Sequence, residues 1–287
     1  MKRYQGSSPL EQTRSMPAWL ARPSFVVGLV IVFLVVVMAL VPQLIAPYDP
    51  IATNVMAQNA APSAEHWFGT DMLGRDIFAR VCVGGRVSLL IALVCTCVQV
   101  VVGCAYGGIM AYFGGWVDNI MMRVIEVMMS IPYLLVVIIV MMVLDNSVPS
   151  LLVALCVTSW CNTARAMRGV ILQLKSSEYV MAAQSLGAPA RRVILKHLIP
   201  NTIGILILNT ATSIPNYIFQ ESTLGFLGIG LQPPNTSLGV MISLGQAAME
   251  FYPLQLIFPA AALVLIVLAF NLLGDGLRDA LDPKLRK

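Results

Sequence analysis

Long apolar runs separated by short polar connectors make up most of the chain. The first run, residues 25–46, has about the 20 residues that a helix needs to cross a bilayer. It is too long for the core of a signal peptide and has no convincing cleavage site, so it predicts a retained first span. Five further spans are predicted at approximately residues 87–112, 120–143, 149–169, 201–219 and 254–273.

The composition supports a membrane protein built from helices. Of the 287 residues, 58% are hydrophobic and 11% are charged, whereas soluble domains average about 25% charged residues. We therefore expect an all-α integral membrane protein with six transmembrane helices. Its predicted parts are an N-terminal segment (1–23), the first transmembrane helix (24–46), a polar segment with a short helix (47–85), a five-helix core (86–275) and a C-terminal tail (276–287).

The basic residues are concentrated in three patches, which predict the orientation. Fourteen of the 18 Lys and Arg residues lie within residues 2–22, 165–196 and 278–287. Because cytoplasmic loops carry an excess of Lys and Arg, we expect all three patches inside and both termini in the cytoplasm. The outside connectors are then 47–85, 145–150 and 220–253. The net charge of +4 needs no nucleic-acid partner to explain it.

Residues 178–200 form the longest amphipathic passage that carries charge. Ser176 or Ser177 can cap a short helix, whose first turn contains Glu178, where a negative charge suits the exposed N–H groups. Gly187 ends this helix, because glycine adopts the left-handed C′ conformation without steric cost. A second helical run follows, in which Pro189 lies near the start, Arg191, Arg192 and Lys196 form the polar side, and Pro200 suits the first turn of the next helix.

One face of the first of these helices combines Tyr179, Ala183 and Leu186. The pair Ala182 and Ala183 keeps the helix slim, so that another backbone or a shallow groove can approach it closely. The passage therefore predicts a helix, a glycine elbow and a second helix at a membrane surface. An ordinary amphipathic connector between two spans would show the same pattern, and this alternative stays open.

The alanine pair, Gly187 and the closing Ile199-Pro200 resemble the "EAA" loop of ABC-importer permeases. The versions Glu178-Tyr179-Val180-x-Ala182-Ala183 and His197-Leu198-Ile199-Pro200-Asn201 are similar to the dipeptide, oligopeptide and nickel branch, as its C-type permease subunit. The glutamate that names the motif is replaced by Met181. This departure removes a carboxylate but keeps the small residues that set the shape.

Three more stretches are similar to the same branch. They are Gly69-Thr70-Asp71-x-Leu73-Gly74-Arg75-Asp76, the glycine-rich segment 221–234 and the C-terminal passage 271–283. In the first, Thr70 or Asp71 can cap the expected short helix. The second is too interrupted by glycine and proline to span, and at membrane depth such backbone must be covered by protein or line an aqueous cavity.

The resemblance implies a type I ABC-importer permease fold in the bacterial inner membrane, with a cytoplasmic coupling helix in the ATPase-docking loop 175–199. The implied ATPase-coupling residues are Glu178, Tyr179, Ala182, Ala183, Leu186, Gly187 and Arg191. The gate candidates are Gly225, Gly228 and Gly230. The implied partners are a paralogous permease subunit, two cytoplasmic ABC ATPases, an extracytoplasmic solute-binding protein and membrane lipid. Di- or oligopeptides are the expected cargo, with nickel or a metal chelate as the alternative.

Other functions find less support in the residues. The chain has no Gly-x-x-x-x-Gly-Lys-Ser/Thr phosphate loop, so ATP hydrolysis is expected on separate subunits and this chain is not expected to be an enzyme. An ion-coupled secondary carrier needs ionisable groups near the bilayer middle. Such groups are nearly absent from the predicted spans, and Arg123 and Glu126 form a local pair near one membrane surface. The charged residues His66, Asp71 and Asp76 show no metal spacing, so a solvated structural role is expected for them.

Sulfur-containing residues are expected to pack rather than to bind a metal or cofactor. The cysteines fit no zinc pattern, and most lie in or beside apolar runs. The repeated methionines of the third predicted span have the adaptable side chains that fill gaps between helices. These residues are Cys82, Cys95, Cys97, Cys104, Cys156 and Cys161, together with Met121, Met122, Met128 and Met129.

Overall fold

The computed structural model describes residues 23–40, 46–233 and 235–281, which fold into helices joined by turns and loops. No strand occurs within these ranges, so the all-α prediction is confirmed for them. The first 22 residues, residues 41–45 of the predicted first span and the tail from residue 282 lie outside the described residues, and the expectations for them stay predictions.

The helices vary from one turn to 37 residues in length. In chain order, the α-helices are α1 (Pro23–Leu40), α3 (Ile77–Phe113), α4 (Gly115–Ser130), α5 (Tyr133–Val143), α6 (Val148–Lys175), α7 (Glu178–Ser185), α8 (Ala190–Arg192), α9 (Ile203–Phe226), α10 (Leu238–Ala247) and α11 (Leu254–Leu281). Two 3₁₀ turns, Val55–Ala57 and Ile199–Thr202, and a π-helical run, Val193–Leu198, complete the helical structure.

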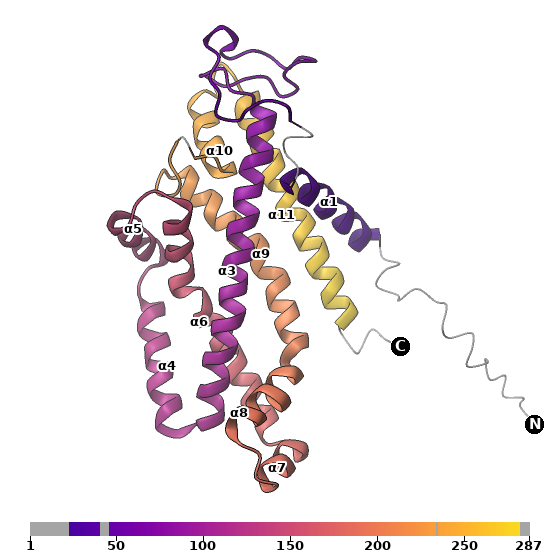
Figure 1. Ribbon diagram of the computed structural model, residues 1–287, viewed down its shortest axis with the longest axis vertical. Coiled ribbons are helices and arrows are strands. Elements are labelled where there is room, and N and C mark those ends of the chain that lie inside the picture. The colour runs from indigo at the N-terminus through magenta and orange to yellow at the C-terminus, as the bar shows by residue number, and fades with distance from the viewer. Residues whose placement is uncertain (1–22, 41–45, 234, 282–287) are drawn as a thin grey trace, which may run out of the picture.

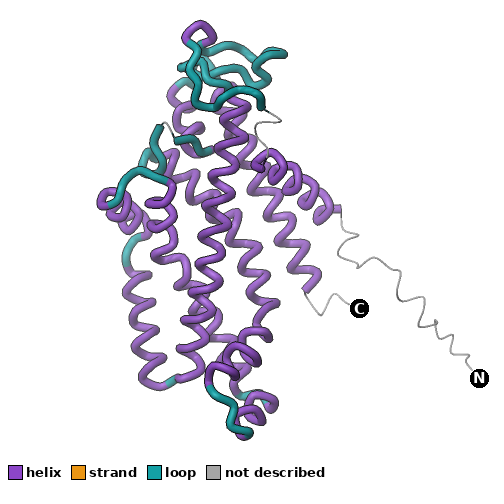
Figure 2. The backbone as a smooth tube through the Cα atoms, in the orientation of Figure 1, coloured by secondary structure: helices purple, strands orange, loops and turns teal. Residues whose placement is uncertain are grey.

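The longest helices run along the long axis of the molecule (Figure 1). α3 packs most extensively against α6 and also contacts α9, while α1 packs mainly against α11. Residues 46–76 form loops at one end of the bundle, here termed the loop end, and α7 lies at the opposite end, here termed the α7 end (Figure 2). This arrangement places α3, α6 and α9 side by side between the two ends.

Several of the described helices have the length and apolar composition of membrane-spanning helices. Four are long and apolar enough to cross it, namely α1, α3, the continuous run Ala190–Phe226 and α11, and the pair α4–α5 adds a fifth if it counts as one span. α6 has 28 residues, a length of about 42 Å at about 1.5 Å per residue, but it carries more polar side chains. A membrane protein with several spans is confirmed, while six spans stay a prediction.

The predicted third span, 120–143, is not a single helix. α4 ends at Ser130 and α5 begins at Tyr133, with an angle of 82° between the two axes. Proline disfavours the helical conformation in the residue before it, and Ile131, which precedes Pro132, accordingly has φ −82° and ψ 126°. The expectation of one continuous helix here is therefore wrong.

The helix that corresponds to the second predicted span, 87–112, begins earlier than the sequence predicted. α3 starts at Ile77, ten residues before the expected start at residue 87, and the side chain of Asp76 caps it by accepting the N–H of Ala79 at 2.7 Å. The short helix expected to be capped by Thr70 or Asp71 does not form within residues 70–76. Asp71 instead accepts the backbone N–H groups of Leu73 and Arg75, at 2.9 and 3.0 Å, and so closes a turn.

The fifth predicted span, 201–219, also ends later than expected. α9 continues to Phe226, so Glu221 and Gly225 lie within the helix and not in an irregular outer segment. Glu221 is fully buried and accepts a hydrogen bond of 2.6 Å from the hydroxyl of Ser88 on α3. An ionisable side chain therefore lies inside the bundle, where the sequence predicted none.

Candidate functional site

α7 is attached to the bundle through one buried side chain. Val180 is fully buried, and burying a valine side chain stabilises by about 1.5–3 kcal/mol. It belongs to an apolar cluster drawn from α3, α6, and the run that leads into α9, and the buried members of this α7 cluster are Cys104, Ala111, Met167, Ile171, Val180, Val193, Ile194, Leu198 and Leu206. The cluster fixes α7 to three long helices at once.

The remaining surface of α7 is exposed and largely apolar. The exposed fractions of Leu186, Tyr179 and Met181 are 88%, 41% and 49%. Of the other predicted coupling residues, Glu178, Ala182, Gly187 and Arg191 are exposed and Ala183 is half-buried. The structure thus brings the predicted coupling residues together on one exposed segment at the α7 end, and a clustered apolar surface of this kind is typical of a protein contact.

The start of α7 differs in detail from the prediction. The helix begins at Glu178, and Ser177 is its N-cap residue with extended backbone angles. However, the Ser177 hydroxyl donates to the carbonyl of Leu174 at 2.5 Å. It therefore closes the end of α6 instead of accepting an N–H group of α7.

The glycine elbow is present, and its hydrogen bonds define it. Gly187 has φ +79°, its N–H donates to the carbonyl of Gln184 at 2.9 Å, and the N–H of Ala188 donates to that of Ala183 at 3.1 Å. These two bonds are the pair that defines a Schellman motif. A Cβ atom at Gly187 would have nothing within 4 Å, so the backbone conformation, and not lack of space, requires glycine.

The elbow leads directly into α9. The expected second helix is not separate, because α8, the π-helical run and the 3₁₀ turn form one continuous span with α9, Ala190–Phe226. Pro200 lies in the first turn of the 3₁₀ segment, and the predicted polar side is exposed at Arg191, Arg192 and Lys196. α7 is therefore joined to α9 by a continuous helical run that begins three residues after Gly187.

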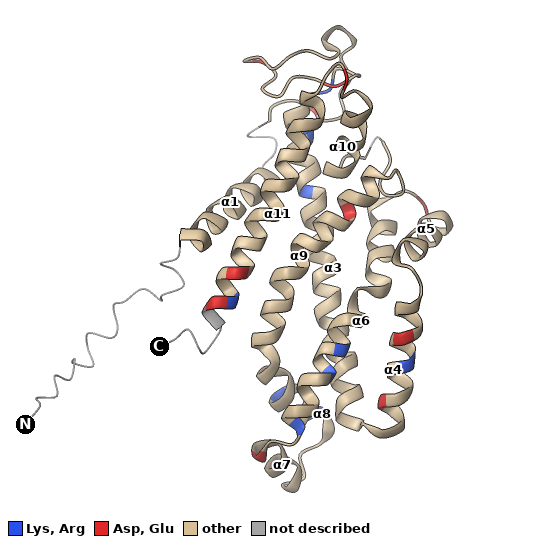
Figure 3. Ribbon diagram, turned by 180° about the vertical axis from the view of Figure 1, so that it is seen from behind, with Lys and Arg blue, Asp and Glu red and all other residues tan. Residues whose placement is uncertain are grey.

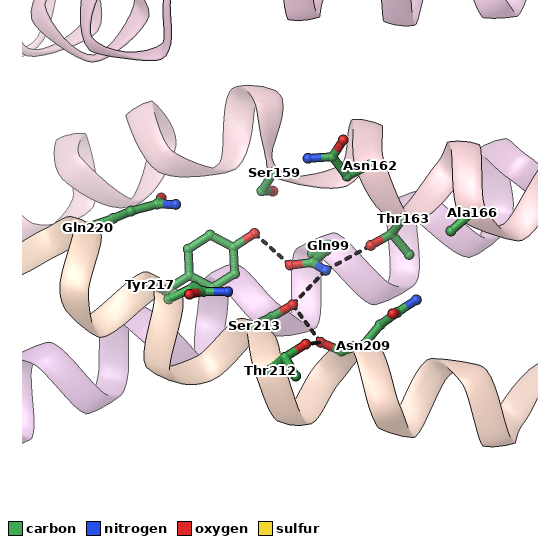
Figure 4. A pocket seen from close by; sticks show the side chains of 11 residues that line it. Gln99, Ser159, Asn162, Thr163, Ala166, Asn209, Thr212, Ser213, Tyr217 and Gln220 are labelled. Carbon is green, nitrogen blue, oxygen red and sulfur yellow. Dashed lines mark hydrogen bonds between the residues drawn. The ribbon is translucent and has the colours of Figure 1, made fainter. Parts of the chain in front are cut away.

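A polar cavity of about 260 Å³ lies between α3, α6 and α9 (Figure 4). Five carboxamides, five hydroxyl groups and one alanine line this cavity, which we term the amide cavity. The lining residues are Gln99, Ser159, Asn162, Thr163, Ala166, Asn209, Thr212, Ser213, Asn216, Tyr217 and Gln220. None of these side chains is ionisable near neutral pH, so the cavity offers hydrogen bonds without net charge.

Gln99 is the centre of the hydrogen bonds in the amide cavity. Its Nε2 donates to Thr163 Oγ1 at 2.8 Å and to Ser213 Oγ at 2.9 Å, and its Oε1 accepts from the hydroxyl of Tyr217 at 2.6 Å. This side chain from α3 thus joins α6 to α9. In Figure 4, no dashed line joins the carboxamide of Asn162 or that of Gln220 to the other residues drawn.

A second cavity of about 380 Å³ adjoins the amide cavity. The two share lining residues on α6 and α9: Ser159, Asn162, Tyr217 and Gln220. The second cavity extends to the bend between α4 and α5, where residues 128–133 line it. The bend at Pro132 therefore forms one wall of a cavity with both polar and apolar lining that lies beside the amide cavity.

The glycine gate candidates lie at the loop end, apart from the lining of the amide cavity. Gly225 is near the end of α9, and a Cβ atom there would be 3.0 Å from the backbone nitrogen of Val240. A Cβ atom at Gly230 would be 2.9 Å from the nitrogen of Gly225, and Gly228 has φ +73°. These contacts fold the segment after α9 back onto that helix, and a gating role for the three glycines stays a prediction.

The charged residues before α3 form a structural network, as expected, but it is more buried than a solvated role suggests. His66 Nδ1 lies 2.8 Å from Asp76 Oδ2. Asp71 pairs with Arg75 and with Arg80 of α3. Because Arg80 is almost completely buried, this network attaches the loops of residues 66–76 to the first turn of α3, at the loop end.

The remaining predicted residues behave as packing or surface groups. Arg123 and Glu126 form an exposed ion pair at 2.6 Å, and Met121, Met122 and Met128 pack against a small cluster around Ile125 while Met129 is exposed. The six cysteines are free; four are buried, Cys156 is half-buried and Cys97 is exposed. No group of three or more metal-ligating side chains occurs among the described residues.

Sequence reasoning missed the amide cavity, although part of its signal was present. Asn209, Ser213, Asn216 and Gln220 recur at i, i+4, i+7 and i+11, which places them on one face of an otherwise apolar helix. Also missed was the ion pair between Arg168 of α6 and Asp118 of α4, whose two hydrogen bonds are both 2.6 Å long. The two residues are 50 positions apart, and neither has a local pattern.

Comparison with known proteins places the chain among transport proteins. Residues 103–287 match the family described as "Binding-protein-dependent transport system inner membrane component", and residues 18–62 match "N-terminal TM domain of oligopeptide transport permease C".

Three curated relatives have the following names and identities. The oligopeptide transport system permease protein OppC of Bacillus subtilis (strain 168) is 43% identical over 261 residues, covering 91% of this chain and 86% of that protein. The dipeptide transport system permease protein DppC of the same organism is 45% identical over 261 residues, covering 91% and 82%. OppC of Haemophilus influenzae is 40% identical over 261 residues, covering 90% and 84%.

Proposed function

Because the chain belongs to the family of binding-protein-dependent transport system inner membrane components, we propose that it is a permease subunit of an ATP-driven importer of di- or oligopeptides. The similarity to oligopeptide and dipeptide permeases over about nine-tenths of the chain carries this proposal. The same names favour peptides over nickel or a metal chelate as the cargo.

The proposed assembly contains this chain, a paralogous permease subunit, two cytoplasmic ABC ATPases and an extracytoplasmic solute-binding protein. The α7 end faces the cytoplasm and the loop end faces outward, in a multi-pass arrangement in the inner membrane with both termini cytoplasmic. The distribution of charge supports this orientation, because basic residues gather near α7, α8 and the adjoining end of α6 (Figure 3).

The amide cavity is proposed to be part of the translocation pathway. A peptide backbone presents one donor and one acceptor at each residue, and a carboxamide side chain offers both kinds of group. The lining can therefore bind any peptide backbone, and its lack of charge avoids selection for one type of side chain. Selection among peptides would then rest mainly with the binding protein.

The coupling step is proposed to begin at α7. The exposed apolar face of α7 docks on an ATPase, and Leu186 and Tyr179 contribute its largest exposed side chains. Closure of the ATPases on ATP moves α7 as a rigid body. The α7 cluster then carries this motion to α3, α6 and α9, the three helices that line the amide cavity.

Reconstituted transport tests this function. The chain is assembled with its partner permease, ATPases and binding protein in proteoliposomes, and uptake of a labelled tripeptide is measured with and without ATP on the ATPase side. The expected result is ATP-dependent peptide uptake that ion gradients alone do not drive. Uptake of labelled nickel without peptide uptake would contradict the cargo, and uptake driven by an ion gradient in the absence of ATP would contradict the mechanism.

A further inference from the structure

An apolar cavity of about 380 Å³ lies between α1, α3 and α11, away from the amide cavity. We term it the apolar wedge. Its walls include Leu34 and Met38 of α1, Val81 and Gly85 of α3, and Ala262 and Leu265 of α11. All of its lining side chains are apolar, Cys82 included, so a water molecule inside would lack the two to four polar partners that buried water needs.

The wedge results from how α1 crosses α11. Near the α7 end of the crossing the two helices are in close contact, because a Cβ atom at Gly28 would lie 2.9 Å from Leu272 Cβ and one at Gly276 would lie 2.2 Å from the ring of Phe25. Figure 1 shows α1 tilted relative to the long axis of the bundle, so its axis crosses that of α11 at an angle. At the loop end, the rings of Phe68 and Phe258 stack at 4.2 Å and cover the wedge.

The wedge is open on the side that faces away from the bundle. Leu34 of α1 and Leu265 of α11 line it, yet their exposed fractions are 54% and 51%. The neighbouring surfaces of both helices are also apolar, with Phe33, Val264 and Leu268 exposed. Because both helices are long and apolar enough to span a membrane, this opening faces the hydrocarbon of the bilayer.

We propose that the apolar wedge binds one acyl chain of a membrane phospholipid. A cavity of about 150 Å³ is known to hold benzene, with six carbon atoms, so by the same measure this wedge holds about fifteen carbons, or one acyl chain and not two. An empty wedge would deprive its walls of dispersion contacts, and the hydrocarbon outside supplies a chain to fill it.

The size of the wedge argues against a helix of another subunit as the occupant. Residues 258–266 of α11 line the wedge, a length of about 12 Å at about 1.5 Å per residue. A helix with its side chains is about 10–12 Å across, so it could cover the opening but not enter. The acyl chain would serve as a third contact between α1 and the bundle, beside those that α1 makes with α11 and α3.

Photocrosslinking in the assembled importer tests this inference. The complex is reconstituted with a phosphatidylethanolamine that carries a diazirine within one acyl chain, and crosslinked peptides are mapped by mass spectrometry after illumination. We expect crosslinks at wedge residues of all three helices, α1, α3 and α11. Crosslinks spread evenly over exposed apolar residues, with no enrichment in the wedge, would overturn the proposal.

Two variants fill the wedge, and a third is a matched control. Gly85→Leu is expected to abolish the wedge crosslinks without a clash at its Cβ atom, which would lie 3.7 Å from Ile266 Cδ1. Ala262→Phe fills the same space from α11, so the test does not depend on one variant folding. Val264→Phe adds a ring on the lipid-facing side of α11, where the exposed fraction is 63%, and should leave the wedge crosslinks intact.

A subunit contact would give a different result. If a photoreactive amino acid placed at Leu265, which lines the wedge and is 51% exposed, captures the partner permease in the complex, and the wedge variants leave lipid crosslinks unchanged, the wedge is a protein interface and the proposal is wrong. Peptide uptake is measured in parallel, because lipid binding here does not depend on the cargo. Loss of the wedge crosslinks in Gly85→Leu and Ala262→Phe, with peptide uptake intact, would support the lipid site and would be consistent with the proposed transport function.

Discussion

Replacing Gly187 by valine tests whether the elbow after α7 transmits force. Gly187 has φ +79°, and no atom lies within 4 Å of the position that a Cβ atom would take there, so the substitution strains the backbone without a steric clash. A residue with a Cβ atom costs about 1–2 kcal/mol in this region, and the β-branch of valine stiffens the chain further. A cost of about 1–2 kcal/mol lowers the population of the left-handed conformation at residue 187, relative to other backbone conformations, by a factor of about 5–30.

The strain would be relieved by leaving the left-handed conformation, which breaks the hydrogen bonds of the Schellman motif. α7 would then meet the ATPase at a different angle while Val180 keeps it near the bundle. We expect Gly187→Val to reach the membrane in normal amounts, to lose most ATPase co-purification and to lose ATP-dependent uptake. The assay is co-purification of the ATPases with tagged chain, alongside tripeptide uptake in proteoliposomes.

Two further variants isolate the backbone effect. Gly187→Asn should retain more ATPase, because asparagine tolerates the left-handed region. Gly169→Val, on α6, has the same change in side chain at a glycine with open space and without positive φ, so it should couple normally. If Gly187→Val holds the ATPases and transports like the unsubstituted protein, the elbow does not transmit force and residues 178–187 are only a connector.

Four shorter predictions follow from the same geometry. Val180→Ala should weaken the attachment of α7 by about 2 kcal/mol, seen as reduced ATPase co-purification, whereas Met142→Ala, at an exposed position on α5, should have little effect. Gln99→Leu removes the hydrogen bonds to Thr163 and Tyr217, at about 1–3 kcal/mol for each buried group, and one to Ser213, which keeps its bond to the Asn209 carbonyl. It should reduce uptake more than Cys97→Leu on the exposed face of α3; equal uptake by the two variants would refute a role for the cavity. A reporter fused after Lys287 should be active in the cytoplasm, and activity only outside would reverse the proposed orientation. The isolated chain should not bind ATP in equilibrium dialysis, and stoichiometric binding would contradict the assignment of hydrolysis to other subunits.

Short sequence signals were enough to predict part of this structure. The elbow at Gly187 and the start of α7 at Glu178 follow from short sequence signals, and the family resemblance read from residues 178–200 is confirmed by the matches over most of the chain. The bend at Pro132 was also visible in principle, but the long apolar run around it suggested one span. Apolarity alone does not distinguish a straight helix from a broken one.

The amide cavity depends on contacts between residues far apart in the chain. Gln99 bonds to Thr163 and Ser213, 64 and 114 positions away, and no local pattern predicts such a pairing. The polar stripe on α9 did carry a signal, since its members share one face. What that face would meet, however, depends on the packing of α3 and α6, which the sequence of α9 does not contain.

The buried Glu221 has a consequence for how the chain is made. An ionisable side chain makes the entry of a single helix into the bilayer less favourable, and α9 also carries Asn209, Asn216 and Gln220. These polar groups lie within a run that is still apolar enough to cross a membrane, and they make its insertion less favourable than that of a purely apolar helix. Ser88, synthesised 133 residues earlier on α3, supplies the hydroxyl that Glu221 needs. Because α3 precedes α9 in the chain, the hydroxyl that binds Glu221 is already synthesised when α9 is made.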